Sequence, residues 1–364
     1  METAQNDTAF MKRTDNCTER LLLSATIKAE ATRLGFDACG IAEARPVDAA
    51  TVEAYRQWIG RGRHGAMEYM SRYEQIRFNP TLLMPRCHTI VSLALNYYPA
   101  RRIADDRPQF AYYAYGKDYH DVMKARIREL AKAVYGASEC SDYSEYSEYS
   151  DSNESRQSRA AEGGSQYRVA VDSAPILERY WATQAGIGWI GRNKNFIIPR
   201  HGSFYVLGEL LLTDAVDRYD TPMPNHCGTC TRCIDACPTG ALSDKGVDAS
   251  RCLSYLTIEH RGAFSAEQES LVRSQPTPYY IYGCDRCQRA CPHNRFATPC
   301  DTAEFQPSDA LLAMTAERWA QLTPEQYREL FRGSPVKRAK YEGLMRNINT
   351  KSPKPPSCPP KVGG

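Results

Sequence analysis

The chain has 364 residues, of which 42% are hydrophobic, and a formal net charge of +3. This length predicts two or three domains with real cores, and so small a net charge gives by itself no argument for a nucleic-acid partner. No apolar run approaches the roughly 20 residues of a membrane helix, and the polar N-terminus lacks the apolar core of a secretory signal. We therefore expect a soluble cytoplasmic protein without a membrane partner.

The first elements are read from periodicity. Residues 18–34 have helical spacing and end near Gly35. The stretches "FDACGIAEA" and "TIVSLALNYYP" predict strands, the second central in its sheet because it is apolar throughout. The stretch "DYHDVMKARIRELAKAVYG" predicts a helix that ends at Gly136.

A Ser-rich, acidic stretch at 138–166 has no aliphatic periodicity, so we expect a disordered surface insertion. Order returns with a strand at 167–172, a helix at 175–185, the glycine-rich loop "GIGWIGRN" and strands near 195–199 and 204–213. The loop could be a plain turn, or its glycines could let the backbone approach a large flat ligand. It follows a helix rather than a strand, which argues against a dinucleotide fold.

Two cysteine runs dominate the 14 cysteines. The run "HCGTCTRCIDACPTG" has gaps of two, two and three residues before a proline, and "GCDRCQRACPHN" follows downstream. Zinc sites usually need only two CxxC pairs or mixed Cys and His. The CxxCxxCxxxCP spacing is instead typical of 4Fe–4S proteins, in which the fourth cysteine ligates the other cluster when two are present.

Reciprocal exchange between the runs gives a ligand set for each cluster. The first set is Cys227, Cys230, Cys233 and Cys291; the second is Cys237, Cys284, Cys287 and Cys252, which lies between the runs in "SRCLSYLTIEH". The remaining cysteines are scattered, and we interpret them as small buried hydrophobes or inert thiols: Cys17, Cys39, Cys87, Cys140, Cys300 and Cys358. Two clusters imply electron transfer to a further group.

Carboxylates lie at two places in the sequence where they could take part in a reaction. Asp172 ends the strand "RVAVD", and such residues face the ligand crevice of α/β proteins. The alternative is that Asp172 or Ser173 caps the next helix. The stretch "GKDYHD" places Asp118, His120 and Asp121 at a helix start, where capping is the default role.

The segment 325–354 is basic, with eight Lys or Arg against three Glu and aromatic residues interleaved. This pattern fits a phosphate-backbone footprint, and equally a solvated helix face. The residues after 350 are rich in Pro and Lys and predict a disordered tail.

These pieces together resemble one family. The stretches "VDSAPILERYWATQAGIGWIGRNKN", "RCLSYLTIEHRG" and "FRGSPVKRAKYEGLMRNI", with both cysteine runs, are similar to the epoxyqueuosine reductases over about residues 20–350. The resemblance implies a cobalamin-dependent iron–sulfur enzyme of queuosine tRNA modification with an α+β fold. It implies an α/β cobalamin and substrate domain (18–221), a ferredoxin-like domain with two 4Fe–4S clusters (222–296), a basic helical segment (297–350) and a tail (351–364).

The resemblance also assigns roles. Electrons from an unidentified external donor would pass through both clusters to cobalamin, and the epoxide of a tRNA wobble base would be reduced. Asp172 would be the proton donor, with a pKa raised by burial beside the corrin. Cobalamin contacts would be Arg77, Asp118, Asn193, Phe196, Leu207 and Ser254, and Asp118 could instead touch the substrate. A tRNA would be bound, by a monomer, through Arg332, Lys337, Arg338, Lys340 and Arg346.

The sequence differs from the family pattern in two features, and three alternative functions remain open. Arg192 stands where the family has a lysine, and the chain ends in a Pro-rich stretch where some members continue into helical repeats. A ferredoxin-like carrier would need neither the first domain nor the basic segment, and an iron–sulfur RNA-binding sensor would turn nothing over. A reductive dehalogenase shares the cobalamin and two-cluster plan but is typically exported.

Overall fold

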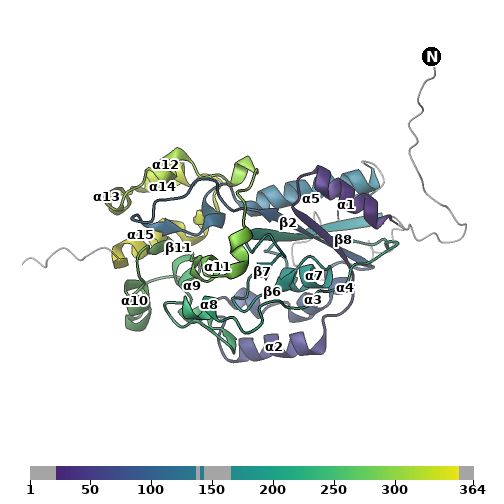
Figure 1. Ribbon diagram of the computed structural model, residues 1–364, viewed down its shortest axis with the longest axis horizontal. Helices are drawn as coiled ribbons and strands as arrows, with labels where there is room; N and C mark the ends of the chain where they lie inside the picture. Colours follow the sequence, from purple (N-terminus) through teal and green to yellow (C-terminus); the bar gives the residue numbers. More distant parts are fainter. Residues whose placement is uncertain (1–21, 137–139, 143–164, 352–364) are drawn as a thin grey trace, which may run out of the picture.

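The computed structural model describes residues 22–136, 140–142 and 165–351, and it shows a twisted sheet with helices on both faces (Figure 1). The sheet has the order β1-β2-β8-β5-β4. Its strands are β1 (Ala38–Glu43), β2 (Thr89–Asn96), β8 (Tyr205–Leu212), β5 (Ser165–Ala170) and β4 (Cys140–Asp142). Neighbours are antiparallel except β4 and β5, which are parallel.

The central place predicted for the apolar strand is confirmed. Every residue of β2 is buried, and β2 pairs with β1 on one side and with β8 on the other. The pairing with β8 extends from Thr89 opposite Leu212 to Asn96 opposite Tyr205. A strand covered on both faces has no solvent side, which is why its sequence is mostly apolar and why its polar residues Thr89, Ser92 and Asn96 are buried as well.

Helices cover the two faces with separate cores. One face packs against α1 (Ser24–Arg33) and α5 (Tyr119–Tyr135), whose buried residues join those of the strands. The helix α5 ends at Gly136, as predicted. The other face packs against α7 (Glu178–Gln184) through Trp181 and Ala182, with α2 (Ala49–Gly60), α3 (Glu74–Phe78) and α4 (Pro80–Leu83) nearby. The mixed helix-and-sheet class expected from sequence is therefore found.

The structure corrects the boundaries of the Ser-rich insertion. Residues at both ends of 138–166 are strands, since Cys140 pairs with Ser165 where β4 joins β5. The parallel pairing extends the sheet by one edge strand. Residues 143–164 lie outside the described residues, as do 18–21 of the first predicted helix and the tail from 352.

The glycine-rich loop forms a small hairpin. Its strands are β6 (Trp189–Ile190) and β7 (Phe196–Ile197), the latter much shorter than the strand expected near 195–199. A Cβ on Gly188 would lie 2.1 Å from the carbonyl oxygen of Ile197. This glycine therefore serves the close approach of the hairpin's own backbone.

The cysteine-rich and basic regions are built from short elements packed onto the sheet domain. Here β11 (Tyr280–Tyr282) pairs in parallel with β3 (Gln109–Phe110), and α15 (Lys340–Lys351) packs against α10 (Ala266–Arg273), β11 and α9 (Leu253–Ile258). One hydrophobic core continues across the predicted boundaries at 221 and 296, because Tyr282 stacks on Phe110 and the tilted ring of Trp319 packs against it.

The remaining elements are short. They are α8 (Arg232–Asp235), β9 (Leu242–Ser243), β10 (Gly246–Val247), α11 (Arg286–Arg289), α12 (Asp309–Leu312), α13 (Ala316–Ala320) and α14 (Pro324–Leu330). Single 3-10 turns lie at Glu68–Met70, Tyr112–Ala114, Ala249–Arg251, Pro292–Phe296, Ala303–Phe305 and Pro335–Ala339. None of the helices in the described ranges has the length and apolar character needed to cross a bilayer.

Candidate active site

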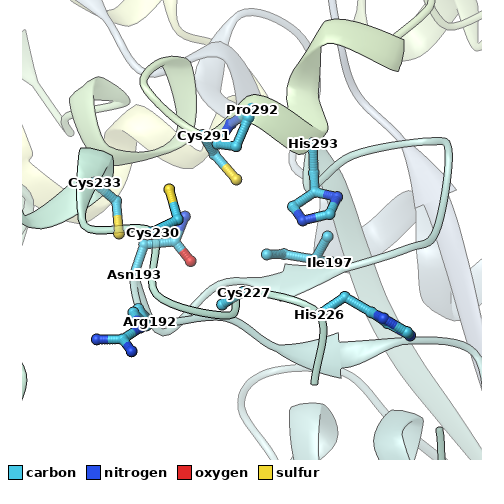
Figure 2. A pocket seen from close by; sticks show the side chains of 10 residues that line it. All are labelled: Arg192, Asn193, Ile197, His226, Cys227, Cys230, Cys233, Cys291, Pro292 and His293. Atoms are coloured by element: carbon cyan, nitrogen blue, oxygen red, sulfur yellow. The ribbon is translucent and has the colours of Figure 1, made fainter. Parts of the chain in front are cut away.

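The first set of cysteines lines one cavity of about 180 Å³ (Figure 2). Cys291, from the second run, lies there with Cys227, Cys230 and Cys233. The two runs reach each other because each continues into a one-turn helix, and these helices, α8 and α11, are in contact. The cavity wall is completed by Arg192, Asn193, Ile197, His226, Pro292 and His293.

The second set of cysteines lies in or next to α8, α9 and α11. Burial raises the pKa of the Cys287 thiol well above its usual range, and the neighbouring thiols Cys284, Cys252 and Cys237 raise it further. Burial followed by Cys237 also raises the pKa of Cys252. Cys252 and Cys284 also pack against the same small hydrophobic core. Cys252, which was placed in this set only because a ligand was missing, is therefore near its expected partners.

The donor chemistry of both sets fits a 4Fe–4S cluster, which takes four cysteine thiolates. Within the described ranges, no three His, Cys, Asp or Glu side chains are spaced to share a single metal ion. A cubane differs in this respect, since it spreads its four thiolates over four irons. Iron would favour the thiolate forms that burial and crowding disfavour.

Asp172 occupies a turn of unusual geometry. Its φ is +52°, and the amide of Ser173 donates to the carbonyl of Val171 at 2.5 Å, which makes Asp172 the middle of a three-residue turn. The helix α7 begins only after Leu177 and has no side-chain cap. The alternative that Asp172 or Ser173 caps this helix is therefore wrong, and the side chain of Asp172 is instead 57% exposed.

Asp118, His120 and Asp172 form a line of hydrogen bonds that ends at this turn. His120 Nδ1 lies 2.6 Å from Asp118 Oδ1, and its Nε2 lies 3.0 Å from Asp172 Oδ2. The Tyr119 hydroxyl donates to the same Asp172 oxygen at 2.7 Å. At the buried end, Lys337 Nζ lies 2.8 Å from Asp118 Oδ2. Asp118 also accepts from the His120 amide and caps α5, so its default capping role is confirmed.

The charges along this line differ from those expected. Burial lowers the pKa of His120, but hydrogen bonds and charge from Asp118 and Asp172 outweigh it and raise that pKa to about 9. Although the Asp172 side chain is 57% exposed, the protein atoms packed around it raise its pKa; hydrogen bonds from His120 and Tyr119 outweigh this and leave that pKa below its usual value. The pKa raised by a neighbouring corrin, which the resemblance implies for Asp172, stays a prediction. The group that holds a proton at neutral pH is the imidazole beside it.

Three of the predicted cobalamin contacts, Arg77, Asn193 and Ser254, have polar side chains. Arg77 is buried, and its Nη2 donates to the carbonyl of Tyr69 at 3.0 Å, while its Nε has no partner among the described residues. Asn193 Nδ2 donates to the carbonyl of Cys287 at 3.4 Å. Ser254 follows Cys252 by two residues in the first turn of α9. The unpartnered Nε of Arg77 and the Asn193 amide beside Cys287 are hydrogen-bond donors of the kind that the amide side chains of a corrin accept.

The other predicted cofactor contacts are occupied within the protein. Phe196 and Leu207 are buried in the core between the sheet and α7. Asp118 is bonded to Lys337 and His120. Any contact these three make with a cofactor stays a prediction.

The predicted tRNA-binding cations differ in their exposure and in whether they are paired with a carboxylate. Arg332 and Lys340 are exposed. Lys337 is exposed but paired with Asp118, and Arg338 is paired with Glu259 at 2.7 Å. Charge spacing alone could not distinguish these situations.

The structure corrects the prediction that Arg346 binds tRNA. Its guanidinium donates to the carbonyls of Leu256, His260 and Gly262 at 2.9–3.0 Å and lies 4.1 Å from the ring centre of Phe264. Burial lowers its pKa to about 10. The side chain joins α15 to the segment after α9, and it is not available to bind a phosphate.

Sequence reasoning missed two partners of Asp172. Tyr119 carried only the signal of standing beside His120, and Glu178 appeared as an ordinary acidic residue at a helix start. Glu178 Oε1 accepts from the amide of Asp172 at 2.5 Å.

Comparisons with known proteins agree with this arrangement. Residues 77–173 match the family described as epoxyqueuosine reductase QueG, and residues 226–294 match the 4Fe–4S double cluster binding domain. The epoxyqueuosine reductase of Leadbetterella byssophila is 40% identical over 327 residues, which cover 89% of this chain and 97% of that protein.

Solved structures show the same fold. A selenomethionine-labelled epoxyqueuosine reductase crystal structure has a TM-score of 0.72 and 25% identity, covering 89% of this chain and 79% of that one. Another, with an epoxyqueuosine-modified tRNA-Tyr stem loop, has a TM-score of 0.70 and 24% identity with the same coverage.

Proposed function

Because the chain belongs to the epoxyqueuosine reductase family, we propose that it reduces the epoxide of epoxyqueuosine in tRNA to the alkene of queuosine. The reaction takes two electrons and two protons and releases the epoxide oxygen as water. The observation that carries the proposal is the 3.0 Å contact between the exposed carboxylate of Asp172 and His120 Nε2, in a chain that also holds two four-cysteine sets.

The cofactors of the proposal are two 4Fe–4S clusters and cobalamin. The matched double-cluster domain spans both cysteine runs and supports the clusters. Arg77, Asn193 and Ser254 would contact cobalamin. When bound, the clusters would supply electrons from an external donor, and cobalamin would supply the reducing chemistry at the epoxide.

The protein's own part is to deliver a proton to the leaving oxygen. Asp172 is the proposed donor, and His120 is the proposed source of its proton. The transfer runs from His120 Nε2 to Asp172 Oδ2, 3.0 Å away, and then to the substrate oxygen. A base that covers the exposed Asp172 would remove water from it, and this raises the proton affinity of the carboxylate when it is needed.

Asp118 and Lys337 orient the donor. Asp118 accepts at His120 Nδ1, 2.6 Å away, and so directs the other ring nitrogen to Asp172. Lys337 neutralises Asp118 at 2.8 Å and also belongs to the basic segment. The proposed tRNA surface therefore begins beside the proton-delivery groups, with Arg332 and Lys340 as its exposed cations.

The test is nucleoside mass spectrometry. Anaerobically purified protein with both clusters and cobalamin loaded is incubated with epoxyqueuosine-containing tRNA and a chemical reductant. We expect conversion to queuosine, with Asp172→Asn retaining iron and cobalamin but losing turnover. No conversion by the loaded wild-type protein would refute the proposed reaction, and normal turnover by Asp172→Asn would refute the role of Asp172.

A further inference from the structure

The turn at Asp172 requires a restraint. A three-residue turn whose central residue has positive φ is rare and strained, and Asp172, at φ +52°, is not a glycine. Its side chain is largely exposed, so packing does not hold it. The carboxylate nevertheless has to stay within hydrogen-bond distance of His120 and Tyr119.

Glu178 supplies a restraint on the main chain. Its Oε1 accepts from the amide of Asp172 at 2.5 Å. Glu178 is the first residue of α7, and this helix is anchored to the sheet by Trp181, which is 2% exposed, and by Ala182, which is fully buried. The Glu178 side chain, which extends from a fixed helix, is thus hydrogen-bonded to the backbone of Asp172, the residue whose orientation matters.

We propose that Glu178 is a positioning residue, which holds Asp172 in its left-handed turn and thereby directs the Asp172 carboxylate to His120 and to the substrate. The proposal deepens the proposed function and rests on it for the role of Asp172. Glu178 acts through the amide of Asp172 and does not touch the substrate.

The electrostatics of the surroundings indicate that Glu178 acts as a neutral acceptor. Burial and then the charge of Asp172 raise its pKa to about 8. The titratable and charged groups that face it come from the turn, α5, α7 and β8: Asp172, His120, Tyr119, Arg179 and Glu209. A second negative charge here would repel the Asp172 carboxylate, whereas a neutral carbonyl oxygen holds the amide without disturbing it.

This neutrality makes glutamine the informative replacement. Glu178→Gln keeps a neutral carbonyl acceptor and replaces the ionisable hydroxyl of the acid by an amide NH2 group. Glu178→Leu keeps similar bulk and removes the acceptor. Glu53→Leu, on an exposed position of α2, is the matched control for adding a leucine.

Two measurements on the loaded protein test the proposal. Hydrogen exchange followed by mass spectrometry, on peptides that span 170–177, should show the turn amides exchanging about tenfold faster in Glu178→Leu, the change expected when one ordinary hydrogen bond is lost. Steady-state turnover should show kcat reduced by at least about tenfold with KM nearly unchanged, because the Asp172 carboxylate loses its orientation while substrate binding is unaffected. Glu178→Gln should stay within about threefold of wild type in both.

The outcomes separate this inference from the proposed function. Unchanged exchange in Glu178→Leu, or a glutamine variant as impaired as the leucine variant, would overturn the positioning role. Faster exchange in Glu178→Leu with normal turnover in both Glu178→Leu and Asp172→Asn would uphold the hydrogen bond and refute the proposed role of Asp172.

Discussion

Replacing His120 by glutamine is the most direct test of the proton-delivery line. Glutamine can keep a hydrogen bond to Asp172 but has no proton to transfer. The imidazole is held 2.6 Å from Asp118 and 3.0 Å from Asp172, and its pKa rises from 6.5 to about 9. At about 1.4 kcal/mol per pKa unit, the surroundings favour the protonated ring by roughly 3 kcal/mol.

The direction of the pH effect follows from that rise. A raised pKa means that His120 keeps its proton below about pH 9 and loses it as the pH increases through that value. Wild-type turnover should therefore fall as the pH rises through about 9. In His120→Gln we expect kcat reduced by about 100-fold or more, the usual contribution of general acid catalysis, and no decline near pH 9.

The assay is single-turnover conversion of epoxyqueuosine tRNA from pH 6 to pH 10, with iron and cobalamin content measured in each variant. His201→Gln, at an exposed histidine, is the control. If His120→Gln keeps wild-type turnover, or keeps the decline near pH 9, the proton does not come from His120. The double variant with Asp172→Asn should be no slower than the slower single variant, since the two residues would serve one transfer.

Further expectations concern the clusters, the basic surface and the packing. Cys252→Ser should lower the iron content from about eight to about four per chain by anaerobic iron analysis; full iron would remove Cys252 from the ligands. Neutralising Arg332 and Lys340 should weaken binding of a tRNA stem loop and reduce its salt dependence by about 1.5 in slope, and an unchanged slope would contradict their phosphate contacts. Arg346→Met should destabilise the loaded protein by about 2–4 kcal/mol, because three carbonyls lose a charged donor; thermal unfolding should show no comparable loss for Arg332→Met. Gly188→Ala should cost about 1–3 kcal/mol, because its Cβ would meet a backbone oxygen at 2.1 Å, and a normal unfolding midpoint would show that the hairpin can yield.

The sequence by itself determined those features that depend on local pattern. The β2 segment is mostly apolar, so its central place in the sheet could be predicted, and the helix before Gly136 carries its own end signal. The cysteine spacing determined the kind of cofactor, because few sites need sulfur at those intervals. Short motifs spread along the chain were enough to indicate the family.

Tertiary structure decided what each polar residue does. Arg346 and Arg332 look alike in a basic segment, but Arg346 is half-buried and bonded to three carbonyls, whereas Arg332 is exposed. Asp172 looked as much like a helix cap as a ligand-facing acid, until the late start of α7 left it in a strained turn. The pKa of His120 depends on two carboxylates, and one of them lies 52 residues away in the chain. Charge and burial act through space, so such roles follow only from the folded arrangement.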